Sequence, residues 1–572
     1  MRKRAFEVAT LALAIAALAL PASGAGADWP TYGHDLTNSR DAGGDGPSQS
    51  QVGSMKQAWS FSSPTGDFTG TPVVSDGVLV AGNNGGWVYA LNAVTGKLLW
   101  SKHVGQPING SAAIDPNAPG GATTYIPVAE AGRPHLLALS LSNGATRWDT
   151  VLTQQPGADV FGSPTFWNGT LYMGTSGNNN DESSARGSLV ALDQADGRVR
   201  WQTFTVPPGH DGGAVWSTPA VDTATGRLYI GTGNAYHAPA ADTTDAMLVL
   251  DASTGQILGH FQSVPGDVWE LDSPTGGPDY DFGASPNLIA GPGGRPLVGE
   301  GSKSGTYWAL DRATMKPAWS LDAGPGSQAD GGINSSAYDG TRIYGTDAIS
   351  SQVFALGRDG KMLWNSADAG PAHFSPVALG HGVVYSVDPA GFLTARDPAS
   401  GKVLAKLPLN GPDFGGVSLV GGAVYVSVGI GPPPQPLPQT DTSGFDGSGS
   451  IVAFGDTSRS GGATAGGRAP ASSLTGHGGS PPARGRAGRI RLSVTPRRAA
   501  AKRPVVFRFR ARSGAGALSG VTIGFAGRHV RTDRRGRAVM RLRLSRPGLH
   551  LAHARRRGMA GARAAVTVTR RR

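Results

Sequence analysis

The sequence contains no cysteine, and only 7% of its residues are aromatic. Without thiols the chain forms no disulfide, and it lacks the C-x-x-C-H motif to which a c-type haem is attached. It is rich instead in glycine, with 87 residues, and proline, with 41. These residues favour many short strands and turns over long helices. The composition therefore predicts an all-β protein that is stabilised by core burial and strand pairing.

Long apolar runs are also missing, apart from one near the N-terminus. Three basic residues at positions 2–4 precede an apolar run over about 8–20, which is too short to span a bilayer. Small residues follow at positions 25–27, and the three parts together are typical of a secretory signal peptide. We predict a signal peptide over residues 1–27 and a secreted or periplasmic, cell-envelope location. A retained N-terminal anchor is the alternative.

The net charge of +11 is unevenly distributed along the chain. Residues 484–572 contain 26 Lys and Arg against a single acid, Asp533, whereas the preceding residues contain 25 basic and 39 acidic side chains. The chain therefore joins an acidic module to a strongly basic one.

One phrase recurs along the acidic module: apolar strand residues, Ala-Leu-Asp or a near variant, a turn that ends in Gly, and a short strand often closed by Trp. Copies lie at 89–100, 137–148, 190–201, 248–261, 308–319, 354–364 and 394–406, with a half-copy near 452–454. Each copy has the chemistry of a β-hairpin. A Trp at a fixed place suggests an anchor that packs one blade against the next. The repeat predicts an eight-bladed β-propeller over residues 28–455.

A second recurring element of small residues lies between the copies, for example at 71–74, 110–113 and 217–220. We interpret it as the innermost strand of each blade, because strands crowd around the central channel. The final half-copy has no strands after it. We therefore expect residues around Trp29 to Arg40 to complete the last blade and to close the ring, which removes exposed sheet edges.

Residues 456–488 consist largely of Gly, Ser, Ala, Pro and Arg, which bury too little apolar surface to fold, and are interpreted as a linker. Residues 489–572 contain alternating segments that predict a small, basic, immunoglobulin-like β-sandwich. Export and the lack of aromatic residues for base stacking argue against nucleic acid as its partner. An anionic cell-envelope polymer, a lipid surface, an acidic partner, the acidic propeller itself and a plain soluble spacer remain as alternatives.

Three phrases carry a resemblance to a known family. They are DWPTYGHDLTNSR at 28–40, AVWSTPAVDTATGRLYIGTGN at 214–234 and YDFGASPNLIAGPGGRPLVGEGSKSGTYWAL at 280–310. Together they resemble the pyrroloquinoline-quinone (PQQ) dependent alcohol dehydrogenases, in particular the polyvinyl-alcohol dehydrogenase-like branch. The resemblance covers about residues 28–455. It implies a quinone that is bound in the central channel on a calcium ion.

The resemblance implies a role for five residues. Asn234 and Glu182 match calcium ligands, Trp216 matches the indole beneath the quinone, Asp281 matches the catalytic aspartate beside the metal, and Lys303 matches the basic residue at the reactive quinone oxygen. These residue types suit the chemistry. Calcium prefers hard oxygen ligands, a carboxylate accepts the alcohol proton while hydride passes to the quinone, and a cation stabilises the oxygen that gains negative charge.

Each of these residues also has a purely structural interpretation. Asn234 and Asp281 are residue types that favour turns, Trp216 is one of several blade-packing indoles, and Lys303 is of a type that usually faces water. Asp279 is a rival base, and Asp181 is a rival to Glu182 as a calcium ligand.

The leading hypothesis is a secreted quinoprotein dehydrogenase that oxidises a small or polymeric alcohol with PQQ and Ca²⁺. Its electrons would pass to a separate acceptor, such as a cytochrome c, because the chain has no haem domain. The rival hypothesis is a non-catalytic propeller that acts as an extracellular binding or assembly scaffold.

Overall fold

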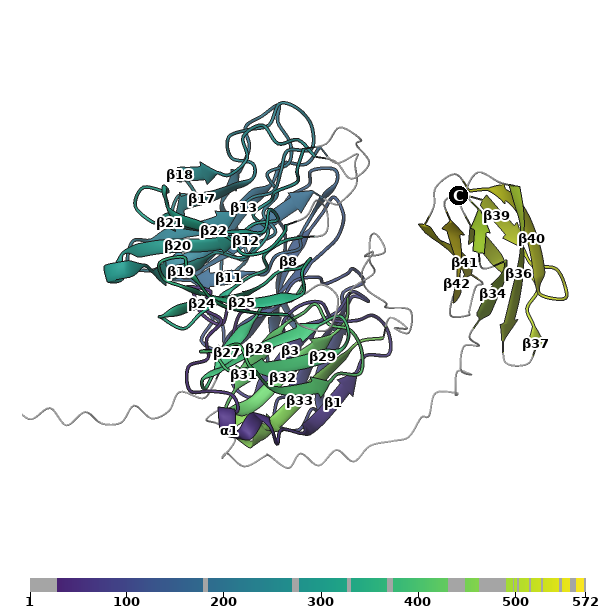
Figure 1. Cartoon of the computed structure of the whole chain (residues 1–572), viewed down its shortest axis with the longest axis horizontal. Helices are drawn as coiled ribbons and strands as arrows, with labels where there is room; N and C mark the ends of the chain where they lie inside the picture. Colours follow the sequence, from purple (N-terminus) through teal and green to yellow (C-terminus); the bar gives the residue numbers. More distant parts are fainter. Residues whose placement is uncertain are drawn as a thin grey trace, which may run out of the picture. The chain divides into compact units, whose positions relative to one another are not determined.

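A computed structural model describes most of the chain and divides it into two compact units, residues 1–468 and 469–572 (Figure 1). The described residues are 28–177, 184–269, 277–326, 331–367, 374–430, 448–461, 490–496, 498–500, 504–513, 516–525, 528–544, 548–555 and 562–569. The predicted signal peptide and most of the predicted linker lie outside them. Among the described residues, none of the helices has the length and apolar character of a membrane span.

The first unit is nearly all β, and its described strands form eight antiparallel sheets. The first four sheets contain β2 (Val73–Ser75), β3 (Val78–Gly82), β4 (Trp87–Asn92) and β5 (Leu98–His103); β6 (Ala113–Asp115), β7 (Thr123–Val128), β8 (His135–Ser140) and β9 (Thr146–Val151); β10 (Ala158–Asp159), β11 (Thr165–Trp167), β12 (Thr170–Gly177), β13 (Ser188–Asp193) and β14 (Val199–Phe204); β15 (Ala220–Asp222), β16 (Arg227–Gly231), β17 (Ala246–Asp251) and β18 (Ile257–Gln262).

The next four sheets contain β19 (Asn287–Ala290), β20 (Pro296–Gly301), β21 (Thr306–Asp311) and β22 (Pro317–Asp322); β23 (Ala337–Tyr338), β24 (Arg342–Thr346), β25 (Gln352–Gly357) and β26 (Met362–Ala367); β27 (Ala378–Gly380), β28 (Val383–Asp388), β29 (Phe392–Arg396) and β30 (Val403–Pro408); β31 (Val417–Val420), β32 (Gly422–Val428), β33 (Ser450–Asp456) and β1 (Gln57–Ser62). Three short helices complete the unit: α1 (Gln49–Val52), η1 (Pro292–Gly294) and η2 (Thr457–Ser460). Serial four-stranded antiparallel sheets are the architecture of a β-propeller.

Tryptophans anchor successive sheets to one another, as their fixed place in the repeat predicts. The indole N–H of Trp100 on β5 donates to the Leu141 carbonyl of the next sheet at 2.8 Å, and its ring lies against Gly144. A Cβ at Gly144 would meet this ring, and the positive φ of 70° also favours glycine there. The same arrangement recurs for Trp148, Trp201, Trp319 and Trp364. The turn glycine of these repeats therefore packs against the indole ring of the preceding sheet.

The last sheet is completed by β1, which pairs with β33. The expectation that residues around Trp29 to Arg40 complete this sheet is wrong. Trp59 of β1 donates to the Ala93 carbonyl of the first sheet at 3.1 Å, and its ring packs on Gly96. Because β1 carries the repeat's closing Trp, it takes the place that the final half-copy lacks.

The segment over residues 28–46, which we name the N-terminal strap, instead crosses the first strands of the sheets. Backbone hydrogen bonds tie it to seven of the eight sheets through Val74, Ile114, Val221, Leu288, Tyr338, Leu379 and Gly421. The Asn38 side chain adds two more bonds, to the carbonyls of Thr218 and Pro286 at 3.0 Å each. An irregular segment whose carbonyls are used in this way cannot also pair along one sheet edge. This is why the strap does not form a strand of the last sheet.

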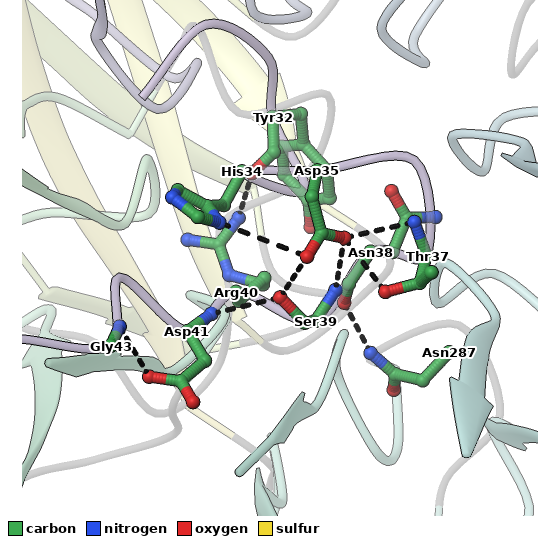
Figure 2. A network of polar contacts seen from close by, with 10 residues as sticks. All are labelled: Tyr32, His34, Asp35, Thr37, Asn38, Ser39, Arg40, Asp41, Gly43 and Asn287. Carbon is green, nitrogen blue, oxygen red and sulfur yellow. Dashed lines mark hydrogen bonds and ion pairs between the residues drawn. The ribbon is translucent and has the colours of Figure 1, made fainter. Parts of the chain in front are cut away.

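Two charged residues of the strap organise its polar contacts (Figure 2). The buried Arg40 guanidinium donates to the carbonyls of Tyr32, Val377 and Val417, and burial lowers its pKa to about 10. The Asp35 carboxylate accepts bonds from the backbone and hydroxyl groups of Thr37 and Ser39. Burial alone would raise the pKa of Asp35, but bonds from His34, Ser39 and Thr37 outweigh it and lower the pKa to about 2.

The second unit contains two sheets that share one apolar core. One sheet contains β34 (Arg491–Thr495), β36 (Pro504–Ser513), β37 (Gly516–Ala517) and β40 (Arg537–Arg543). The other contains β35 (Arg498–Ala500), β42 (Ala562–Thr569), β41 (Gly548–Arg555), β38 (Thr522–Phe525) and β39 (Arg528–Arg531). Phe525 packs edge-on against Phe507 and Phe509 in this core.

Candidate active site

Four of the five predicted site residues lie in one place, at the same ends of two consecutive sheets. Trp216 precedes β15 and Asn234 follows β16, while Asp281 precedes β19 and Lys303 follows β20. The first two strands of each sheet are antiparallel, so the start of one and the end of the next meet at one edge. The topology therefore collects residues that are up to 87 positions apart in the sequence.

The centre of this site is an ion-paired lysine. Lys303 Nζ lies 2.7 Å from Asp281 Oδ2 and hydrogen-bonds both carboxylate oxygens of Asp279 at 3.0 Å. The backbone N–H of Lys303 also donates to the Asp281 carbonyl at 2.9 Å. Burial alone would lower the pKa of Lys303, but the two carboxylates outweigh it and raise the pKa above its ordinary value. Lys303 is therefore a mostly buried, charged side chain, 13% exposed, and not a solvated one.

Asp279 is fully buried and has a positive φ of 53°, a conformation that is uncommon for a residue with a side chain. This backbone allows two acids, Asp279 and Asp281, to reach the same ammonium group although only Tyr280 separates them. The structure thus places both rival bases at the site and distinguishes them by their contacts.

Asn234 lies directly beside Asp281. Its backbone N–H donates to Asp281 Oδ1 at 2.7 Å, and its side-chain nitrogen donates to the carbonyls of Ala235 and Trp269 at 2.6 and 2.8 Å. With the nitrogen held in this way, Asn234 Oδ1 is left to accept a hydrogen bond or to bind a metal ion.

Trp216 is half-buried and has its ring against Gly283, where any Cβ would overlap the indole. Lys303 Nζ lies 5.3 Å from the centre of this ring and 5.9 Å from that of Trp269, within the range of cation–π contacts. None of the indole contacts to the next sheet described above involves Trp216. It belongs to the site and differs in this from the blade-packing tryptophans.

Glu182 and its rival Asp181 lie outside the described residues. The preceding strand, β12, ends at Gly177, whose N–H donates to the Tyr236 hydroxyl at 3.2 Å. Burial and the nearby Asp281 carboxylate raise the pKa of Tyr236 above its ordinary value. Tyr236 thus connects the end of β12 to the segment that carries Asn234.

Sequence reasoning missed Trp269 and Asp245 at this site. Asp245 is fully buried, has a φ of 49°, and has no hydrogen-bond partner for its carboxylate oxygens in the described part of the chain. Burial and the charges of Asp281, Asp267 and Asp279 raise its pKa. Neither residue lies in a copy of the site phrases. Trp269 lies outside the hairpin copies, but so do Trp87, Trp167 and Trp216, so its place in the sequence does not distinguish it.

The site lies at the other end of the first strands from the N-terminal strap. Val221 of β15 donates to the Leu36 carbonyl of the strap at 2.6 Å, and Leu288 of β19 donates to the Thr37 carbonyl at 3.0 Å. Val221 is five residues after Trp216, or roughly 16 Å of extended chain. The strap therefore leaves the site end of the sheets uncovered.

The oxygens of Asn234 and Asp281 suit calcium, which takes several hard oxygen ligands and accepts ligands from a cofactor. No cluster of three or more acidic or histidine side chains in the described ranges forms a metal site by itself. A metal at this position thus requires oxygens beyond this pair. The carboxylates can accept a proton, and the lysine can stabilise a negatively charged oxygen.

The chain is similar to one protein-family model and to several known proteins. A family model described as outer membrane protein assembly factor BamB matches residues 52–265 and 244–429. A polyvinylalcohol dehydrogenase of a Pseudomonas species is 28% identical over 466 residues, which cover 70% of this chain and 73% of that protein. A polyvinylalcohol dehydrogenase of Sphingopyxis sp. strain 113P3 is 27% identical over 498 residues, with coverage of 74% and 76%.

The fold also matches a solved structure. The quinohemoprotein alcohol dehydrogenase of Comamonas testosteroni superposes with a TM-score of 0.62 at 20% sequence identity, and covers 79% of this chain and 82% of its own. At that identity the similarity establishes the fold, which is the β-propeller that the repeat predicts.

Proposed function

Because the chain belongs to the quinoprotein alcohol dehydrogenase family of PQQ-repeat propellers, we propose that it is a dehydrogenase that oxidises an alcohol with PQQ and calcium. One observation carries the proposal. Four predicted site residues lie together at one end of the sheets: Asp281, Lys303, Asn234 and Trp216. Lys303 pairs with Asp281 and lies over the Trp216 ring, and the Asn234 N–H donates to Asp281. Residues that only hold strands together do not need these contacts. The two polyvinylalcohol dehydrogenase relatives support a polymeric alcohol as a substrate, alongside small alcohols.

The residues have separate roles in this proposal. Asn234 Oδ1 and an Asp281 oxygen would contribute to the calcium site, together with Glu182 and oxygens of the cofactor. The Trp216 ring would support the flat face of the quinone, and Trp269 would flank Lys303. PQQ, when bound, supplies the acceptor for the two electrons that leave the alcohol carbon as hydride. The alcohol proton goes to an Asp281 oxygen, which acts as general base.

Lys303 keeps Asp281 ready for this role. Its ammonium group holds Asp281 Oδ2 at 2.7 Å while the Asn234 backbone N–H holds Oδ1 at 2.7 Å, so the carboxylate is fixed in position at the site. The second carboxylate, Asp279, also holds Lys303 through two hydrogen bonds, so the ammonium group stays in place when Asp281 becomes neutral. Lys303 is also the cation that would stabilise the oxygen of the reduced quinone.

The arrangement of the eight sheets is part of the same proposal. If they are the eight blades of a closed ring, their first strands line the axis, and the N-terminal strap closes the axial channel at one end. Substrate and cofactor would then enter from the end that carries Asp281. Closure by the Trp59 contact with the first sheet supports the ring.

Export and a separate electron acceptor complete the proposal. The basic, apolar and small-residue parts of residues 1–27 support a secreted or cell-envelope protein. A chain without cysteine holds no c-type haem, so a separate acceptor such as a cytochrome c would take the electrons. N-terminal sequencing of the protein recovered outside the cytoplasm, beginning at Asp28, is the expected result.

The test is to titrate PQQ, with and without Ca²⁺, into the full-length protein while tryptophan fluorescence is recorded. Dye-linked oxidation of small alcohols and of polyvinyl alcohol is then measured. We expect calcium-dependent quenching and turnover, with turnover abolished in Asp281→Asn. A matched control is Asp242→Asn, whose side chain is 76% exposed. Loss of turnover in Asp279→Asn but not in Asp281→Asn would identify Asp279, and not Asp281, as the general base.

A second function is favoured by one observation, which is that the matching family model is described as an outer membrane assembly factor. A propeller that lacks the cofactor would act as a binding scaffold. Absence of PQQ binding at micromolar concentration, with Ca²⁺ present and the protein folded, would favour the scaffold and reject the dehydrogenase.

A further inference from the structure

The strongly charged face of the second unit has no role in the proposed dehydrogenase chemistry. On β36 and β40, inward-facing Phe507, Phe509, Ala511, Ala538 and Met540 alternate with exposed arginines. Six arginines of these two strands are exposed, and we name five of them, Arg508, Arg510, Arg512, Arg537 and Arg541, the arginine face; the sixth is Arg543, at the end of β40. Because side chains alternate along a strand, all five point to the solvent side of the same sheet.

The pairing register brings these cations close together. Arg510 lies directly opposite Arg537 across the β36–β40 pair, and on its other side it lies opposite Ser493 of β34. Opposite residues on adjacent antiparallel strands have Cβ atoms about 5 Å apart, and like charges at that separation destabilise the sheet. Folding alone would not select this arrangement. It becomes favourable when an anion lies across the face.

The unit supplies no anion of its own for this purpose. Its single acid, Asp533, is in the turn between β39 and β40, where its Oδ1 accepts the backbone N–H groups of Arg535 and Arg537 at 2.8 Å each. Within the described ranges, no ion pair joins any of the five arginines to a carboxylate. The counter-charge must therefore come from outside this unit.

The chemistry of the face distinguishes between polyanions. Guanidinium groups bind phosphate and carboxylate through two parallel hydrogen bonds. On β36 they recur about every 7 Å along the strand, and Arg510 and Arg537 lie about 5 Å apart across the β36–β40 pair, a spacing that suits an extended chain with a charge on each repeat. The aromatic rings of β36 face the core, so no ring is available for base stacking. Val539 is the exposed large apolar residue of this sheet, which is too little for insertion into a bilayer.

We propose that the arginine face binds a linear anionic polymer that carries a phosphate or carboxylate on each repeat. The face would hold the propeller at that polymer, independently of whether the propeller oxidises an alcohol. An acidic protein fits less well, because protein interfaces rely on buried aromatic anchors that this face lacks.

The experiment measures binding of the full-length protein to fluorescent long-chain polyphosphate by anisotropy in 150 mM NaCl. The test variant is Arg508→Gln/Arg510→Gln/Arg537→Gln. The control, Arg528→Gln/Arg531→Gln/Arg534→Gln, removes the same charge from exposed positions of β39 and the turn that follows it. We expect affinity to fall about tenfold or more in the test variant and about twofold in the control, because charges beyond about 8 Å are screened at this salt concentration. Triphosphate should bind much more weakly than the long polymer.

Folding is checked by thermal unfolding, where the test variant should be as stable as the wild type or more so because a like-charge pair is removed. A second variant, Arg508→Lys/Arg510→Lys/Arg537→Lys, keeps the charge but loses the paired N–H donors of the guanidinium groups. It should weaken polymer binding by a smaller factor than the glutamine variant does. Equal losses in test and control variants would overturn the proposal, since binding would then follow total charge. Tighter binding to anionic lipid vesicles or to single-stranded DNA than to polyphosphate would also overturn it. So would absence of polymer binding by the wild type.

Discussion

Lys303 Nζ lies 2.7 Å from Asp281 Oδ2 and also hydrogen-bonds both oxygens of Asp279, so two buried acids share a single cation. The carboxylates come from the residues before β19, and the lysine follows β20 of the same sheet. This pairing ties the two inner strands together at the end where the candidate site lies. Its removal should therefore affect both stability and chemistry.

Replacing Lys303 with Met should destabilise the protein by about 3–5 kcal/mol, because it leaves two buried carboxylates without a counter-charge. Urea unfolding at pH 7 measures this loss. Lys303→Arg keeps the charge and should lose much less. A loss of stability as large in Lys303→Arg as in Lys303→Met would mean that the ion pair is not its cause.

Replacing Gly283 with Ala should displace the Trp216 ring, because the added Cβ would overlap the indole. Overpacking of this kind costs about 1–3 kcal/mol, so PQQ affinity should fall by about tenfold. Tryptophan fluorescence reports both the moved ring and the titration. The control is Gly44→Ala, where an added Cβ meets no atom within 4 Å. Equal affinity in the two variants would remove Trp216 from the cofactor site.

The contact between Trp59 and the first sheet predicts how the protein unfolds. Trp59→Ala should cost about 2 kcal/mol, less than for a fully buried Trp because the ring is half-exposed. Trp100→Ala removes an equivalent anchor between two sheets that are consecutive in the sequence. In a closed ring the two variants should lose similar stability in thermal unfolding. A negligible effect of Trp59→Ala beside a large effect of Trp100→Ala would mean that the last and first sheets are not joined in a closed ring.

Asp35 of the N-terminal strap predicts a pH dependence of stability. Its folded-state pKa of about 2 is below the ordinary value of 3.8, so the ionised carboxylate stabilises the folded state. This contribution is fully present above about pH 4 and is lost as the pH falls toward 2. Asp35→Asn should therefore be less stable than the wild type at pH 6, and the difference should vanish near pH 2. A difference that is constant between pH 6 and pH 2 would contradict the hydrogen-bonding role of the carboxylate.

The location of the strap shows where local patterns are insufficient. The last sheet needs another strand, and the sequence pattern alone predicts that residues around Trp29 to Arg40 provide it. In the structure β1 provides the strand, and Arg40 instead donates to three carbonyls, two of which belong to residues more than 300 positions away. No periodicity within the strap encodes bonds that depend on seven separate sheets.

The sequence by itself determined the repeated four-stranded sheets, the indole anchors and the separation of charge between the two modules. Strand alternation, turn glycines and charge are local properties that can be counted along the chain. Only the tertiary structure decided that Asp279 and Asp281 share Lys303, that Trp269 and Asp245 belong to the same site, and that the arginines of β36 and β40 form one face. Those relationships depend on strand register and on contacts between distant segments, which exist only after the sheets have packed.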